Sequence, residues 1–188
     1  MSPADEPGRP EQLLAAARAL GTRSGVGALS LRAIAAEAGV SKALVLYHFA
    51  GKAALLEALV DATGHGSAAR LAAAARTPRA MAAWRALLRD PVQRREAAFL
   101  ATLLLEADVE VTRTAAVRVA REGAASALAV AVLADVGLAP RVPAPAIGRL
   151  LLRQLDGLAI ASARGAMDDE ALEAEIDTCA LALLGLAR

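Results

Sequence analysis

The chain has 188 residues and a formal net charge of +1, and 56% of its residues are hydrophobic whereas only 2% are aromatic. This length suffices for one compact unit with a sizeable core, or for a small domain joined to a larger one. The dominance of alanine and leucine favours helices over sheets, and the near-neutral charge gives no global sign of nucleic-acid binding, for which a local basic face is enough.

The number of cysteines and the distribution of apolar residues indicate the cellular compartment in which the protein is expected to work. The single cysteine, Cys179, excludes an internal disulfide and a metal site made of several cysteines, and it suits a reducing environment. Asp5, Glu6 and Glu11 surround the start, where a secretion signal needs basic residues and an apolar run. The longest apolar run, residues 123–134, is too short to span a bilayer. We therefore expect a cytoplasmic protein without a membrane segment.

A loose tail and one helix are predicted first. Residues 1–8 are rich in proline and acidic residues and show no apolar period. Pro10 suits the first turn of a helix, and apolar residues then recur at helical spacing between Leu13 and Leu20. A pair of glycines ends this helix at about residue 25.

Two short helices are predicted next, separated by a tight turn. Ser30 can cap the first, over residues 31–38, in which apolar residues at i, i+3, i+4 and i+7 give one buried face. Gly39 ends it, and Ser41 offers a new N-cap two residues later. The next helix, over about 42–49, must therefore leave at a steep angle, which makes the pair a helix-turn-helix.

A longer helix begins near Lys52, after Gly51. The triplet of Gly64, His65 and Gly66 is expected to interrupt or kink it, since glycine costs about 1 kcal/mol relative to alanine inside a helix. Prolines and glycines divide the remainder into further helices. These are predicted at about 79–89, 92–107, 110–136, 144–164 and 169–187. The chain is thus predicted to be all-α, with about nine helices in total.

Several short motifs stand at set intervals between about Leu13 and Val60. They are Ile34-Ala35, Gly39-Val40-Ser41, His48-Phe49, Gly51-Lys52 and Leu55-Leu56. With these motifs the segment closely resembles the N-terminal DNA-binding domain of TetR-family regulators. The resemblance implies a three-helix helix-turn-helix DNA-binding domain over residues 9–53, followed by a helical effector-binding and dimerisation domain over residues 54–188.

The helix over 42–49 is expected to be the recognition helix. Val45 and Phe49 are apolar and four residues apart, so they should pack inward against Ile34 and Leu20. The rest of the helix would face outward, and a helix of this width fits the major groove of B-DNA. The predicted DNA-binding residues are Ser30, Arg32, Ser41, Lys42, Ala43, Leu44, Leu46, Tyr47, His48 and Lys52.

Local charge supports this surface. Between Arg18 and Lys52 the chain has five basic residues and one acidic residue. Lys42 is the best candidate for a hydrogen bond to a guanine edge, whereas Ala43 and Leu44 offer apolar contact to thymine methyl groups.

Other side chains of this set are expected to contact phosphates, which set the register without reading the sequence. They are Ser30, Tyr47, His48 and Lys52. In the family, a tyrosine that touches the DNA backbone is common where this chain has Leu46, so we expect Tyr47 to make that contact here. Taken singly, each serine or lysine is equally well an ordinary cap or a solvated charge, and His48 a packed core residue.

The resemblance also implies that the fourth to seventh helices enclose an effector pocket. Ligand pockets are mostly apolar, with a few polar anchors, and the middle helices carry large apolar residues. The predicted pocket residues are Met81, Trp84, Leu88, Phe99, Thr102, Leu103 and Glu106. Composition favours an apolar or amphipathic small molecule. The alternative is that the apolar residues are plain core and the polar ones surface positions.

The last two helices are expected to form a four-helix bundle with a second subunit. Each carries an apolar stripe, and Gly157, Ala161 and Gly165 recur every four residues, which permits close helix approach. The predicted interface residues are Ile147, Leu151, Leu155, Leu158, Ser162, Leu172, Ile176, Cys179 and Leu183. The alternative is that the stripes pack on their own subunit, because an apolar stripe in the sequence does not show which surface covers it.

These features predict a DNA-binding transcriptional regulator. Repression, with release from a palindromic operator by a small-molecule effector, is the mode that the resemblance implies. If the effector moves the DNA-binding helices, the triplet at residues 64–66 is a candidate flexing point, although an ordinary helix end explains it equally well.

The sequence also bears on two other classes of function. With two histidines and one distant cysteine, the chain offers no metal-ligand or catalytic spacing, so we expect neither an enzyme nor a cofactor. The alternative is a helical ligand-sensing or partner-binding protein with little sequence-specific DNA binding, because the recognition helix lacks arginine and glutamine.

Overall fold

The computed structural model describes residues 9–106 and 111–187, so the predicted tail at 1–8 lies outside the described residues. These ranges form nine α-helices and one short 3-10 helix, and their single β-bridge joins Pro140 and Ala187. The helices are α1 (Arg9–Ser24), η2 (Val26–Ala28), α2 (Leu31–Glu37), α3 (Lys42–His48), α4 (Lys52–Ala75), α5 (Ala80–Arg89), α6 (Pro91–Glu106), α7 (Val111–Asp135), α8 (Ala144–Ala163) and α9 (Asp169–Leu184). The predicted all-α fold is confirmed, although the short helix η2 was not predicted.

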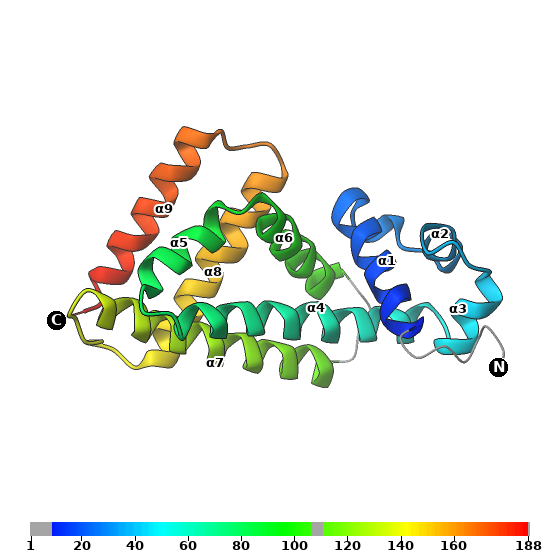
Figure 1. The fold of residues 1–188 in the computed structure, drawn as a ribbon, viewed down its shortest axis with the longest axis horizontal. Coiled ribbons are helices and arrows are strands. Elements are labelled where there is room, and N and C mark those ends of the chain that lie inside the picture. Colours follow the sequence, from blue (N-terminus) through cyan, green and yellow to red (C-terminus); the bar gives the residue numbers. More distant parts are fainter. Residues whose placement is uncertain (1–8, 107–110, 188) are drawn as a thin grey trace.

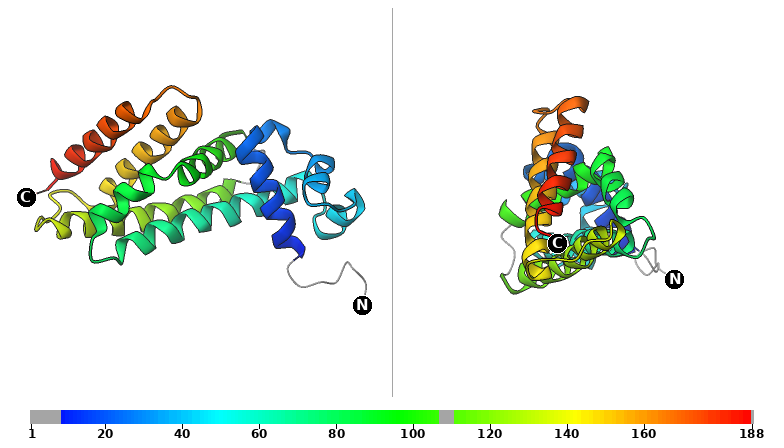
Figure 2. Two further views of the ribbon diagram at one scale, coloured as in Figure 1. Left: turned by 45° about the horizontal axis from the view of Figure 1, so that its top comes forward. Right: turned by 90° about the vertical axis from the view of Figure 1, so that its left-hand side faces the viewer.

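Helix α4 organises the molecule. Its start lies among α1, α2 and α3, which we call the head, and it then runs through the remaining helices, which we call the body (Figure 1). Helix α7 lies along α4, α8 packs against α7 and α6, and α9 lies at the end of the body far from the head (Figures 1 and 2). The molecule is therefore elongated, with the head at one end.

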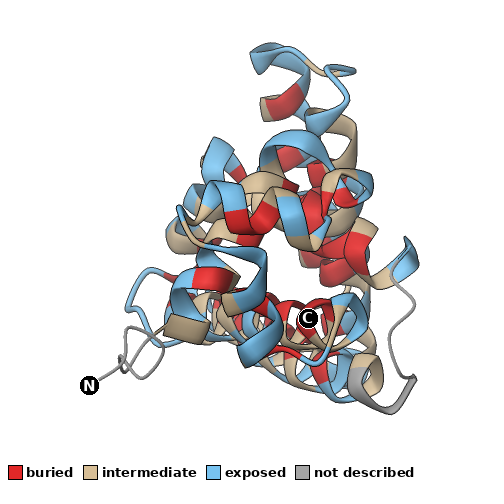
Figure 3. Cartoon of the chain, turned by 90° about the vertical axis from the view of Figure 1, so that its right-hand side faces the viewer, coloured by how far each residue is buried: buried red, intermediate tan, exposed pale blue. Residues whose placement is uncertain are grey.

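Two clusters of buried side chains hold this arrangement together. The body cluster draws its buried members from α4, α5, α7, α8 and α9. The head cluster includes Leu13, Ile34 and Val45, but also Phe99 and Leu103 from α6. Viewed from the head end, buried residues face inward and exposed residues outward (Figure 3). The head is thus fixed to the body through a shared apolar core.

The predicted interruption at residues 64–66 is wrong, because α4 is a single helix from Lys52 to Ala75 (Figure 1). Gly64 is buried, and a Cβ at this position would lie 2.2 Å from Cγ1 of Val117 on α7. The glycine lets α4 and α7 approach closely, and packing along α7 offsets its low helix propensity. His65 is exposed, with Nδ1 2.7 Å from the carbonyl oxygen of Asp61.

Candidate nucleic-acid interface

The turn between α2 and α3 is built from local hydrogen bonds. Gly39 has a φ of +67°, a left-handed conformation that glycine adopts without strain. Its N–H donates to the carbonyl of Ala36 at 3.2 Å, and the N–H of Val40 donates to that of Ala35 at 2.9 Å. This pair of bonds is a Schellman motif, which ends α2 and redirects the chain into α3.

Two serines cap the helices on either side of the turn. Ser30 Oγ accepts a hydrogen bond from the N–H of Ala33 at 3.1 Å, and Ser41 Oγ accepts one from the N–H of Leu44 at 3.2 Å. Both predicted N-caps are confirmed. Because both serines remain exposed, their hydroxyl hydrogens stay available to a phosphate oxygen.

One face of α3 is anchored in the head cluster. Val45 is fully buried and Phe49 is 8% exposed, and both belong to the same cluster as Ile34, with Leu20 packed against it. The predicted inward orientation is confirmed. It fixes which side of α3 is presented to solvent.

The opposite face of α3 is open. Lys42 and Ala43 are exposed, and Leu44 is half-buried. Leu46 and Tyr47 are 43% and 66% exposed, so two large, partly apolar residues lie next to one another at the surface. A surface of this kind on a helix end-capped by Ser41 is suited to contact with another molecule.

His48 is less available than its neighbours. Its ring lies edge-on to that of Tyr47, with centroids 5.1 Å apart and planes at 83°. Its Nε2 atom is buried and has no hydrogen-bond partner in the described part of the chain. This geometry agrees better with the packed alternative than with a phosphate contact through Nε2.

Charge is more localised than the count of basic residues indicates. Arg23 pairs with Glu37 at 2.8 Å, and Arg18 lies 3.8 Å from Glu96. The other basic residues of this stretch are exposed and have no ion pair within residues 9–106 and 111–187. They are Arg32, Lys42 and Lys52. The positive charge near α3 therefore comes from these three residues.

The predicted effector-pocket residues do not surround one cavity. Met81, Trp84 and Leu88 belong to or pack on the body cluster, whereas Phe99 and Leu103 belong to the head cluster. The two polar members point elsewhere: the hydroxyl of Thr102 donates to the carbonyl of Ala98 at 2.8 Å, and Glu106 is exposed. The structure therefore does not bring this predicted set together around one cavity. The helical periodicity of the sequence identifies positions that are buried, but it does not show which of the two clusters each position belongs to.

A different, narrow cavity of about 50 Å³ lies between α4, α5, α6, α7 and α8. Of the predicted residues it shares only Leu88, and it brings Arg70, Arg94 and Arg121 together. Arg121 is 5% exposed, and it donates to Asp156 and to Ser67. Sequence inspection missed this arginine because the charged residues around it on α7 look like an exposed face.

The predicted interface residues of α8 and α9 lie in the chain's own core. All except Leu155 and Ser162 are buried in the single subunit, and Leu155 packs against the body cluster. They are Ile147, Leu151, Leu158, Leu172, Ile176, Cys179 and Leu183. The alternative of own-subunit packing therefore describes these side chains, and they are not available as the outer surface.

The outer faces of α8 and α9 carry different residues. On α9 the exposed side chains are either acidic or small, apart from Leu181, a large apolar residue that is 70% exposed. On α8, Gly157 is exposed, and a Cβ at this position would meet nothing within 4 Å. The exposed residues of α9 with short or apolar side chains are Ala171, Ala174, Thr178, Leu181 and Ala182.

Neither a metal cluster nor a membrane-spanning helix is found in the described ranges. No group of three or more histidine, cysteine, aspartate or glutamate side chains is placed to hold a metal ion. No single helix there is long and apolar enough to cross a membrane; α3 and α4 together have sufficient length and composition, but they bend by 67° at their junction.

Comparison with known proteins agrees with this geometry. Residues 13–59 match the sequence profile of bacterial regulatory proteins of the tetR family. None of the curated proteins matches the chain.

Solved structures extend the similarity beyond the head. A transcriptional regulator from Rhodococcus sp. RHA1 is 28% identical, with a TM-score of 0.72 over 95% of this chain and 97% of that one. A second putative transcriptional regulator from the same source has a TM-score of 0.75 at 17% identity, covering 92% of this chain and 94% of its own. SmeT, solved in complex with triclosan, has a TM-score of 0.65 at 17% identity, covering 95% and 90%.

Proposed function

Because this chain belongs to the TetR family of transcriptional regulators, we propose that it is a repressor that binds a palindromic operator as a homodimer and is released by a small-molecule effector. The observation that carries the proposal is the exposed face of α3, which is anchored by Val45 and Phe49 and bordered by basic side chains that form no ion pair within the described part of the chain. We assign residues 9–53 to DNA binding, and residues 54–188 to the effector and the second subunit.

The proposed base contacts lie at the start of α3. Lys42 would donate to the O6 or N7 atom of a guanine, and Ala43 and Leu44 would contact thymine methyl groups. Leu46 is exposed beside them and would add apolar contact. With a single cation aimed at base edges, sequence discrimination depends strongly on apolar contacts and on half-site spacing.

The proposed phosphate contacts surround this face. Arg32 and Lys52 would supply charge, and Tyr47 would donate its hydroxyl hydrogen. Ser30 and Ser41 would donate theirs while continuing to cap their helices. His48 would contribute by positioning the ring of Tyr47, which it contacts edge-on.

The proposed dimer surface is the outer face of α8 and α9 rather than the buried stripes. Small side chains such as Gly157 and Ala174 let helices approach closely, and Leu181 supplies an exposed apolar anchor. A two-fold dimer presents two copies of α3, so the operator would have matching half-sites.

The effector part of the proposal is supported by SmeT, a structural neighbour solved with triclosan. In the present chain, the cavity among α4 to α8 has a volume of about 50 Å³, well below the volumes typical of ligand pockets. An effector bound there would have to separate the surrounding helices, and α4 among them leads directly into the head.

The test is selection of duplexes from a random pool, followed by titration of the selected duplex with the wild-type protein and two variants. We expect the selected duplex to be palindromic. Lys42→Ala should bind it about tenfold more weakly and show a relaxed base preference at one position per half-site, whereas Arg76→Ala should bind it as the wild type does. Arg76 is the matched control because it is exposed at the opposite end of α4.

Salt dependence provides a second readout. Lys52→Ala should weaken binding to all duplexes alike. It should also reduce the slope of the logarithm of the binding constant against the logarithm of the salt concentration by about 1, because one phosphate contact is lost. A pool that yields no preferred sequence, together with equal binding by the wild type and Lys42→Ala, would leave the partner-binding alternative as the better description.

A further inference from the structure

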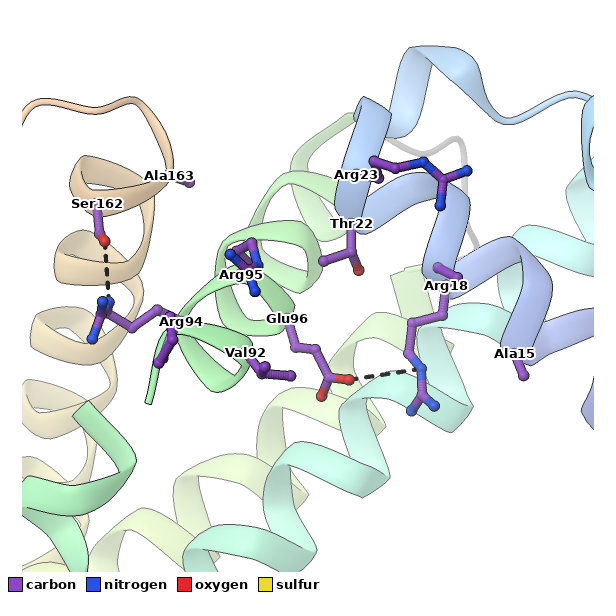
Figure 4. A pocket seen from close by; sticks show the side chains of 12 residues that line it. Ala15, Arg18, Thr22, Arg23, Val92, Arg94, Arg95, Glu96, Ser162 and Ala163 are labelled. Carbon is purple, nitrogen blue, oxygen red and sulfur yellow. Dashed lines mark hydrogen bonds and ion pairs between the residues drawn. The ribbon is translucent and has the colours of Figure 1, made fainter. Parts of the chain in front are cut away.

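A larger groove lies between α1 of the head and the first turns of α6 and the end of α8 in the body (Figure 4). Its volume is about 770 Å³, which is within the range of small-molecule sites. Charged side chains line it from both sides: Arg18 and Arg23 come from α1, and Arg94, Arg95 and Glu96 from α6. Four arginines thus share the groove with one carboxylate.

The arginines of α6 are not neutralised by carboxylates within the described residues. Arg94 is half-buried, and its guanidinium donates hydrogen bonds to neutral oxygens: Ser162 Oγ at 3.0 Å, and the carbonyls of Leu88 and Arg89 at 2.7 and 2.5 Å. These bonds hold the guanidinium in place without cancelling its charge. Arg95 is exposed and forms no ion pair there. A fixed, partly buried cation without a counter-charge is costly unless an anion approaches it.

The arginines of α1 differ in availability. Arg23 is occupied by Glu37 at 2.8 Å. Arg18 is only loosely held, because its Nε lies 3.8 Å from the carboxylate of Glu96, which has a shorter contact of 3.0 Å to Arg70 of α4. Figure 4 shows Arg18 and Glu96 facing one another across the groove. Arg18 is therefore free to exchange Glu96 for another anion.

The rest of the lining is small and apolar. It consists mainly of Ala15, Ala19, Pro91, Val92 and Ala163. A few fixed polar groups on an otherwise apolar wall are typical of sites for small organic molecules. The planar fork of arginine matches a carboxylate or a phosphate, which both accept two parallel hydrogen bonds.

We propose that this groove binds a small organic anion, whose carboxylate or phosphate is held by Arg94 and Arg95 of α6 and by Arg18 of α1, and whose apolar part lies on the alanines of α1 and on Val92. Such a ligand would bridge α1 and α6 and strengthen the existing contact between head and body, which the shared apolar core provides. This second step rests on the proposed function: occupancy then changes the affinity for the operator, and operator binding changes the affinity for the anion by the same factor.

The direct test uses two fluorescent probes that differ in charge. The first is 8-anilinonaphthalene-1-sulfonate, an aromatic anion, and the second is N-phenyl-1-naphthylamine, which has the same rings without the sulfonate. We expect the double variant Arg18→Gln/Arg95→Gln to bind the anion about tenfold more weakly and the neutral probe equally well, because only charge-assisted hydrogen bonds are lost. Arg76→Gln, which removes one exposed charge at the far end of α4, should bind both probes as the wild type does.

Competition with inorganic phosphate and with benzoate identifies the preferred acidic group. The variants replace exposed or half-exposed side chains, and circular dichroism melting curves verify that they fold. Equal affinity of the wild type and the double variant for the anionic probe overturns the site. So does equal displacement by both competitors in the double variant and the wild type.

The coupling is tested separately, by repeating the anion titration with the selected operator duplex present. A changed affinity supports the coupling, and an unchanged affinity overturns it while the site stands. If no duplex is selected, the proposed function fails, but the probe titrations on the free protein still decide the site.

Discussion

Arg121 of α7 and Asp156 of α8 form a two-point ion pair inside the body, with Nη2–Oδ1 at 2.6 Å and Nη1–Oδ2 at 3.2 Å. The side chain of Arg121 is 6% exposed and that of Asp156 is 26% exposed. The pair joins two helices that cross in the body, so that each partner makes the burial of the other tolerable.

Asp156→Ala should destabilise the protein by about 3 kcal/mol, because it leaves the charge of Arg121 buried without a partner. Urea denaturation measures the change. Glu122→Ala is the control, since its pair with the exposed Arg118 on the same helix should contribute under about 1 kcal/mol. Similar losses in both variants would contradict a special role for the buried pair.

Gly64→Ala should cost about 1–2 kcal/mol, although alanine is the better helix former, because its Cβ would overlap Cγ1 of Val117. Gly66→Ala, two residues along the same helix, should be neutral or stabilising, since its Cβ would meet only the end of the Arg70 side chain at 3.5 Å. Adding Val117→Ala to Gly64→Ala should recover stability relative to the sum of the single losses. Additive losses would mean that the two residues are not in contact.

Ser30→Ala and Ser41→Ala should each destabilise the head by about 1 kcal/mol, because Ala33 and Leu44 lose the acceptors for their N–H groups. Glycine at either position should cost only a few tenths of a kcal/mol. Thermal melting followed by circular dichroism measures both series. A larger loss with glycine than with alanine would contradict the capping role.

The pair of Arg89 and Glu173 makes a pH-dependent contribution to the contact between α5 and α9. Hydrogen bonds from the Arg89 guanidinium, at 2.7 and 2.6 Å, lower the pKa of Glu173 and raise that of Arg89. A carboxylate with a lowered pKa stabilises the folded state above its unfolded pKa, and this contribution is lost as the pH falls through the folded pKa. Arg89→Gln should therefore lower stability at neutral pH, with the difference from the wild type vanishing in acid.

Two measurements verify this pH dependence. A carboxyl titration by NMR should show the pKa of Glu173 rising in Arg89→Gln, and urea midpoints across the acid range should converge for the two proteins. High salt should also reduce the difference, because the pair is exposed. A difference that is the same at every pH would point to lost packing instead.

The head could be predicted from the sequence because its determinants are local. Ser30 and Ser41 each accept a hydrogen bond from the backbone N–H three residues further along the chain. The Schellman motif at Gly39 uses carbonyls no more than five residues away from their donors. The inward side of α3 likewise follows from the spacing of Val45 and Phe49. Such contacts are specified within one or two turns of chain.

The body could not be predicted at this level, because its determinants lie far apart in the sequence. Trp84 and Phe99 are both buried and aromatic on successive helices, yet they belong to different clusters. In the sequence, Gly64 looks like a helix break. In the structure it is the point at which α4 contacts Val117 of α7, a residue far away along the chain. Periodicity likewise identified the stripes of α8 and α9 as apolar faces, but it does not show that most of these side chains are already buried within a single subunit.

The unbroken course of α4 has a mechanical consequence. Its 24 residues form a rod about 36 Å long, at 1.5 Å per residue. A tilt of about 5° at the body end displaces the head end by about 3 Å, close to the rise of about 3.4 Å per base pair along the axis of B-DNA. A rearrangement too small to disturb the core of the body is thus sufficient to put α3 out of register with its groove by one base step.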